Sequence, residues 1–200
     1  KNKGTYTEWS GQFLARRVHA IFYSIEYKDK LNYHPDIFRS FNEANEYNDE
    51  HFIINQSYMV DYRYGKKNEK YMYPETIKPI VSHLGNYLFI LKKVNTKLGN
   101  KTIKDKILVI DDYLANGEKV FLDELSKIKF EIAKEVFLYS ECPIQKDIEQ
   151  CESSEKAQEI IDEYYGQIFI NDYKEYIEKL TARLLDIDLS TNPFMNKKKN

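Results

Sequence analysis

Two asparagines stand nine positions apart at the two ends of a short apolar run, and their side-chain oxygens are of the kind that can hold a hard cation such as magnesium. The run between them, residues 87–91, is continuous and of strand length, so we expect a buried strand there. Apolar residues then recur at helical spacing as far as Ile103, which predicts a helix that opens near Lys92 and holds Asn95 in its first turn. Asn86, at the other end of the run, follows a glycine. On residue types alone, a Gly-Asn turn, a core strand and a solvated helix remain an open interpretation.

Lysines gather around the second asparagine, and positive charge at that point would attract phosphate. They are Lys92, Lys93, Lys97, Lys101, Lys104 and Lys106. A second basic cluster lies upstream and consists of Arg63, Lys66 and Lys67. The formal net charge of the whole chain is −2, so the chain lacks the strongly basic balance of many DNA-binding modules. Any contact with nucleic acid must therefore be local.

The asparagine segment resembles the second half of the HNH nuclease domain found at the C-terminal end of GmrSD-type restriction endonucleases and related ParB-like phage-defence proteins. Those domains carry a Gly-Asn-x-x-Leu-x-x-x-x-x-x-Asn pattern, then Leu-x-Asn, then a lysine several residues on. The matching residues in this chain are Gly85, Asn86, Leu88 or Ile90, Asn95, Leu98, Asn100 and Lys106. The resemblance covers roughly residues 10 to 138.

In that family, the other half of the site is an acidic residue followed directly by histidine at the end of a strand. Glu50 and His51 match this pair, although the proline that the family carries after the histidine is absent. A rival alignment places residues 70–76 there, and that alignment keeps the proline at Pro74. It would put a lysine in the carboxylate position and Tyr71 in the histidine position, and the site would then be inactive. We favour Glu50 and His51 because an apolar strand-like run follows them.

The resemblance implies a DNA endonuclease that hydrolyses phosphodiester bonds with one divalent metal, Mg²⁺ or Mn²⁺. His51 would be the general base for the attacking water, while Glu50 and Asn95 would hold the metal. Asn86 would orient the histidine ring or the neighbouring loop. The DNA contacts would come from Lys92, Lys93, Lys97, Lys101 and Arg63. The implied substrate is double-stranded DNA, foreign or modified, with a nucleotide-hydrolysing sensor domain or subunit as partner.

The remaining sequence reads mainly as amphipathic helix. Helical spacing predicts helices over about residues 7–28, 35–47, 119–138, 155–165 and 170–186. Between Ser57 and Lys78 the chain is rich in tyrosine, which either stacks on exposed bases or lies half buried in a hairpin or loop. His19 and His34 are weaker site candidates, best interpreted as structural residues.

The fold class we expect is α+β and mainly α-helical, with a ββα-metal (HNH-like) unit set among amphipathic helices. We place the nuclease domain at residues 1–140, with its motif core at about 49–106, and a helical extension with a disordered tail at 141–200. The alternative is a catalytically inactive HNH-derived module, or an unrelated helical module, that binds a partner protein through the face of residues 170–184.

The cysteines and the hydropathy of the sequence bear on where in the cell the protein is located. Cys142 and Cys151 are read as reduced thiols, and no apolar stretch reaches the length of a membrane span. We expect a cytoplasmic protein with no membrane partner. Because the chain begins without methionine, we also expect it to be part of a longer polypeptide or a trimmed one.

Overall fold

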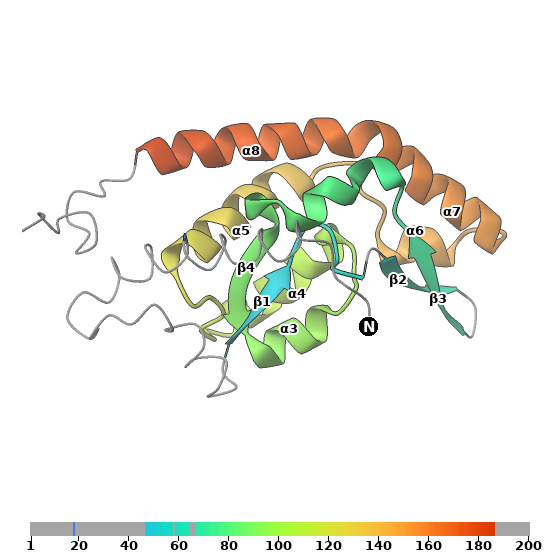
Figure 1. Ribbon diagram of the computed structural model, residues 1–200. Helices are drawn as coiled ribbons and strands as arrows, with labels where there is room; N and C mark the ends of the chain where they lie inside the picture. Colours follow the sequence, from blue (N-terminus) through green and yellow to red (C-terminus); the bar gives the residue numbers. More distant parts are fainter. Residues whose placement is uncertain (1–17, 19–46, 58, 65–66, 187–200) are drawn as a thin grey trace, which may run out of the picture.

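The computed structural model describes residue 18 and residues 47–57, 59–64 and 67–186. Within these residues the fold is α+β and mainly helical, as the sequence predicts (Figure 1). The helices expected over residues 7–28 and 35–47, the candidates His19 and His34 and the C-terminal tail lie outside the described residues, except for Val18, which is helical, and Tyr47.

Strands β1 (Tyr47–His51) and β4 (Tyr87–Leu91) form one antiparallel pair, although 35 residues separate them in the chain. The register sets Glu50 opposite Leu88 and His51 opposite Tyr87. Four successive residues of β4, from Tyr87 to Ile90, are buried. A strand covered on both faces needs an apolar residue at every position, and this explains why its sequence does not alternate.

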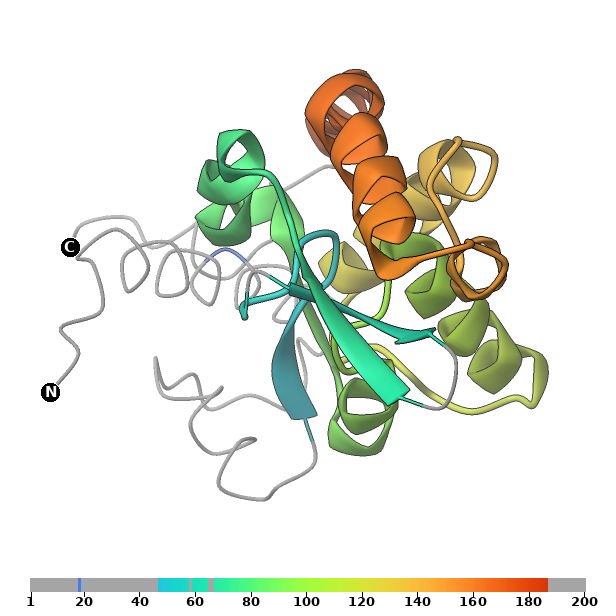
Figure 2. The ribbon, with the colours of Figure 1, turned by 90° about the vertical axis from the view of Figure 1, so that its right-hand side faces the viewer.

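Strands β2 (Met59–Tyr64) and β3 (Lys67–Met72) form a separate antiparallel hairpin (Figure 2). Tyr71 and Tyr73, at the end of this hairpin, are buried in the core. The side-chain amide of Gln158 donates to the backbone carbonyl of Met72 at 3.1 Å and so connects the hairpin to the C-terminal helices. The hairpin interpretation of the tyrosine-rich stretch is therefore correct for these two rings, which are not exposed for stacking on bases.

A 3₁₀ segment, η1 (Glu75–Ser82), and a short 3₁₀ turn, η2 (Leu84–Asn86), lead into β4. Helix α3 (Lys92–Leu98) begins directly after β4. The predicted single helix is wrong at its far end, because Gly99 has φ of +49° and terminates α3. The chain restarts as helix α4 (Ile103–Ala115), whose first turn is capped by the hydroxyl of Thr102 accepting from the Asp105 amide at 3.1 Å.

Helix α5 (Glu124–Phe137) begins later than the sequence predicted. The backbone just before it lies along β4 instead: Leu91 N–H donates to the Val120 carbonyl and Leu122 N–H donates to the Phe89 carbonyl, both at 2.9 Å. Asp123 then caps the helix by accepting from the Ser126 amide. Apolar periodicity alone could not separate these extended residues from the helix that follows them.

The C-terminal part contains helices α6 (Gln145–Glu149), α7 (Ser154–Glu163) and α8 (Phe169–Leu185), with a π-helical turn, η3 (Tyr164–Ile168), joining the last two. Helix α6 lies between two of the helices expected from the spacing, over residues 119–138 and 155–165, where the sequence analysis placed none. Helix α8 lies along α5 at one side of the molecule (Figure 1). Cys142 and Cys151 are free thiols, as predicted.

One apolar core joins the two parts of the chain that the sequence analysis separated. It includes β4 residues such as Leu88 and Ile90 together with Tyr165, Phe169 and Tyr176 from the C-terminal helices. None of the helices in the described part of the chain is both long and apolar enough to cross a membrane.

Candidate functional site

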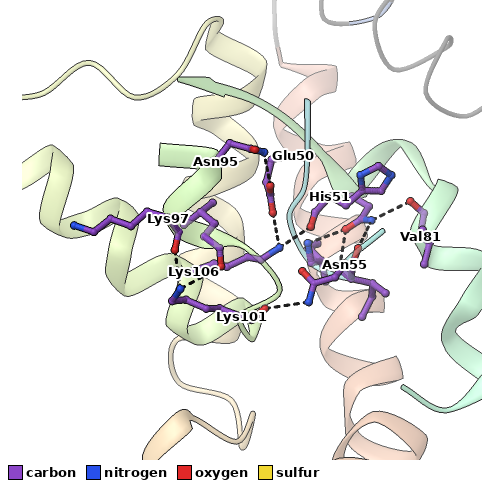
Figure 3. Close-up of polar contacts among 12 residues, drawn as sticks. Glu50, His51, Asn55, Val81, Asn95, Lys97, Lys101 and Lys106 are labelled. Carbon is purple, nitrogen blue, oxygen red and sulfur yellow. Dashed lines mark hydrogen bonds and ion pairs between the residues drawn. The ribbon is translucent and has the colours of Figure 1, made fainter. Parts of the chain in front are cut away.

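The strand pair and the helix after it bring the predicted metal-holding residues into contact. Glu50 lies near the end of β1, and Asn95 lies one turn into α3. The side-chain amide of Asn95 donates to Oε2 of Glu50 at 2.6 Å (Figure 3). The order of strand, strand and helix therefore places together two residues that are 45 positions apart in the chain.

Lys106 completes this cluster from helix α4. Its Nζ lies 2.5 Å from the other carboxylate oxygen of Glu50, Oε1, and donates to the carbonyl of His51 at 2.7 Å. The lysine side chain is fully buried, and that of Glu50 is nearly so. Burial lowers the pKa of Lys106, because a low-dielectric environment disfavours the charged amine, while the Glu50 carboxylate opposes that shift.

The His51 ring lies on the other side of β1. Successive residues of a strand point to opposite faces, and Figure 3 shows the ring directed away from Glu50 and Asn95. It packs instead against its cross-strand partner Tyr87, with ring centroids 4.7 Å apart. The structure thus gathers Glu50 and Asn95 but does not bring the His51 imidazole to the same point.

Asn86 braces the loop that follows β1. Its Oδ1 accepts from the backbone amides of Ile53 at 2.7 Å and Ile54 at 2.8 Å. Its Nδ2 donates to the carbonyls of Ile54 and Val81 at 2.9 and 3.0 Å. Of the two roles that the sequence analysis left open for Asn86, the structure has the loop-orienting one.

Strand pairing brings Glu50, rather than the segment of the rival alignment, to the asparagine segment. Strand β3, which contains Lys70 and Tyr71, pairs with β2, whereas β4 pairs with β1. Tyr71 is buried in the core, and Asn95 contacts Glu50. The residues that meet the asparagine segment are therefore those of the favoured alignment.

The predicted DNA-contacting lysines lie on and after helix α3. Lys92, Lys93 and Lys97 are exposed. The ammonium groups of Lys93 and Lys97 each lie 5.4 Å from the ring centroid of Tyr113, and Lys93 also pairs with Glu118. Part of the positive charge of this face is therefore already balanced.

The remaining basic candidates, Lys101, Arg63 and Lys106, lie at three different places in the fold. Lys101 is partly exposed, and its Nζ donates to the carbonyl of Lys97 at 2.7 Å. Arg63 lies on β2 opposite Asn68 in the register. Lys106, counted in the sequence analysis among the lysines that surround the site, is instead buried inside it.

Glu50 and Asn95 carry the oxygen types that a magnesium ion keeping most of its waters binds. Such an ion is held by few protein oxygens, and Glu50 offers a carboxylate while Asn95 could turn its amide to offer Oδ1. Within the described part of the chain, no group of three histidine, cysteine, aspartate or glutamate side chains is placed to hold a metal. The Lys106 ammonium would compete with a cation for Glu50.

The sequence did not place Lys106 in this cluster with Glu50. A signal existed, because the buried positions of α4 include Ile103, Lys106, Ile107 and Ile110. These are one helical stripe, and a lysine within such a stripe requires a buried partner of opposite charge. The sequence could not say which carboxylate that partner would be.

No protein-family model, no curated protein and no solved structure matches this chain. Its function must therefore be argued from the site itself.

Proposed function

We propose that this chain is an HNH-type DNA endonuclease that hydrolyses phosphodiester bonds with a divalent cation. One observation carries the proposal: the Asn95 amide lies 2.6 Å from the Glu50 carboxylate, across a strand, strand and helix arrangement. A carboxylate and an amide oxygen suit Mg²⁺ or Mn²⁺. A bound cation would supply positive charge where negative charge develops on the leaving oxygen.

The protein residues divide the remaining work. Glu50 and Asn95 would hold the cation, and Lys97 and Lys92 would bind the phosphate backbone from the exposed face of α3. Asn86 keeps the loop after β1 in place. His51 is the proposed base, but its ring lies on the opposite face of β1 from Glu50, so the backbone at the end of β1 must rearrange before the ring can accept a proton from water beside Glu50.

A second candidate function, a catalytically inactive module that binds a partner protein, is favoured by the position of Lys106. Its ammonium already neutralises Glu50 at 2.5 Å, as a bound cation would. If that ion pair is permanent, the chain has the architecture of a nuclease site without the chemistry. The implied setting, restriction of foreign or modified double-stranded DNA beside a nucleotide-hydrolysing sensor, belongs to the first candidate alone.

A plasmid-nicking assay separates the two candidates. The unaltered chain, His51→Ala and Asn95→Ala would be compared in Mg²⁺, in Mn²⁺ and in a chelator, with Lys174→Ala on the exposed face of α8 as the control. We expect metal-dependent nicking by the unaltered chain and the control, and a loss of at least about a hundredfold in the other two variants. Equal activity in all four proteins, or none in any, would contradict the nuclease proposal.

A further inference from the structure

Helix α8 packs against the turn that precedes β4. The hydroxyl of Tyr176 donates to the carbonyl of Gly85 at 2.9 Å, and Tyr176 is fully buried. A Cβ placed on Gly85 would lie 2.8 Å from Cδ1 of Ile177, closer than real Cβ contacts allow. A methyl group at this position would therefore force the Ile177 side chain to shift, and would crowd the side chains of Tyr173 and Tyr176.

A second contact joins the same two segments one turn earlier on α8. The hydroxyl of Tyr173 lies 2.7 Å from Nδ1 of His83, and the Gly85 amide donates to the same nitrogen at 3.2 Å. Because an N–H already points at Nδ1, this nitrogen is an acceptor and Tyr173 donates to it. Both contacts fall within residues 83–85, so α8 is attached to this turn by two hydroxyls and by packing.

The turn leads directly to the loop beside the candidate site. Asn86 follows Gly85, and its backbone carbonyl accepts from the Phe52 amide at 2.8 Å. Its side-chain oxygen accepts from the amides of Ile53 and Ile54. These three residues come immediately after His51, so the position of Asn86 governs the backbone at the end of β1.

We propose that α8 positions the candidate site through Gly85 and Asn86, and that Tyr176 is a positioning residue for it. The inference rests on the proposed nuclease function for its catalytic consequence, but not for the mechanical coupling itself. The C-terminal helices are then a working part of the nuclease unit, because without α8 the turn at residues 83–86 loses its contacts with Tyr173, Tyr176 and Ile177.

The test changes each partner of the contact between α8 and the turn at residues 83–86. Tyr176→Phe removes one hydroxyl from the helix, and Gly85→Ala adds a methyl group to the turn. Tyr164→Phe is the matched control, because it removes a buried hydroxyl that donates to Asp172 at 2.9 Å in the same C-terminal part without contacting Gly85. Amide hydrogen exchange of residues 52–54 would be measured by NMR in the full chain, relative to α5 amides that exchange through global unfolding.

We expect Tyr176→Phe to speed exchange at residues 52–54 about fivefold, the change that loss of one ordinary hydrogen bond allows, while Tyr164→Phe leaves it unchanged. We expect Gly85→Ala to speed that exchange as well, because the added methyl group displaces the side chains of α8 that contact the turn. We also expect kcat for nicking to fall by a similar factor in Tyr176→Phe, with KM for DNA unaltered, since the lysines of α3 are untouched. Exchange in Tyr176→Phe equal to that of the unaltered chain, or an equal increase in the control, would overturn the inference. If the unaltered chain does not nick DNA, the nuclease proposal fails while the exchange result still decides the coupling.

Discussion

The Nζ of Lys106 lies 2.5 Å from Oε1 of Glu50, and both side chains are buried between β1 and α4. The pair connects residues 56 positions apart. By contrast, the Lys156–Glu159 pair on α7 has side chains 61% and 66% exposed. Ion pairs of these two kinds differ in the cost of losing one partner, because only the buried charge cannot be solvated by water.

The buried pair predicts a large loss of stability when the lysine alone is replaced. Lys106→Met should lower the free energy of unfolding by about 3 to 5 kcal/mol, because it leaves the Glu50 carboxylate buried without its cation. The double variant Glu50→Gln with Lys106→Met should recover part of that loss. Urea denaturation measures both, and Lys156→Met, at the exposed pair, should change stability by less than about 1 kcal/mol. A double variant no more stable than Lys106→Met alone would contradict this account.

Asn86 should be among the least replaceable polar residues of the chain. Asn86→Ala removes four buried hydrogen bonds and leaves the amides of Ile53 and Ile54 without their acceptor. We expect a loss of about 3 kcal/mol or more in urea denaturation. Asn116→Ala, which removes an exposed hydrogen bond at the end of α4, should cost about 1 kcal/mol or less. Similar losses at the two positions would show that the loop does not depend on Asn86.

Lys129 should make stability rise with pH. Burial lowers the pKa of this amine from 10.5 to about 7, and Asp123 opposes the shift. Between these two values the unfolded chain binds the proton that the folded chain has released, so stability increases as pH rises and is lost as pH falls toward 7.

The slope contributed by Lys129 should approach about 1.4 kcal/mol per pH unit, and Lys129→Met should remove it. The measurement is urea denaturation at pH 7, 8 and 9, below the range in which the tyrosines with raised pKa begin to lose protons. A difference in stability between the two proteins that does not change with pH would contradict the shift.

The same substitution should change the titration of His83. Burial, and secondarily the charge of Lys129, lower the pKa of His83 below its ordinary value of 6.5. In Lys129→Met the charge is gone, so the pKa of His83 should rise, as measured by NMR titration of the ring protons. The control is Lys134→Met, which removes another lysine of α5, one that pairs with Asp111 of α4. It should leave the pKa of His83 unchanged. An unchanged pKa in Lys129→Met would mean that burial alone lowers it.

Metal binding can be tested without DNA. If Glu50 and Asn95 hold a cation, Mn²⁺ should raise the melting temperature of the unaltered chain in a concentration-dependent way. Glu50→Gln and Asn95→Ala should each weaken that response by tenfold or more in apparent affinity. Asn116→Ala, on a different helix, should keep it. The same rise in all four proteins would place any bound metal elsewhere.

Local order along the chain was predictable from the sequence. The apolar run at residues 87–91 is the strand β4 with the predicted bounds, and the helix at Lys92 begins where the spacing indicated. The proximity of Glu50 and Asn95 was also expected, because the resemblance to an HNH domain implied that both residues hold one cation. Patterns of this kind survive in sequence because burial requires apolar residues at regular positions.

Tertiary structure alone decided four further points. The bridge from residues 120–122 to β4 looked helical, since short extended segments carry too few residues to display a period. Strand pairing sets Glu50 of β1, and not residues 70–76, beside the strand that precedes Asn95. Strand alternation places the His51 ring on the side of Tyr87. The partner of Lys106 is set by which helix packs on which strand. The sequence shows a lysine within an apolar helical stripe, and such a lysine needs a buried carboxylate as partner. Only the packing of α4 against β1 determines that this carboxylate is Glu50.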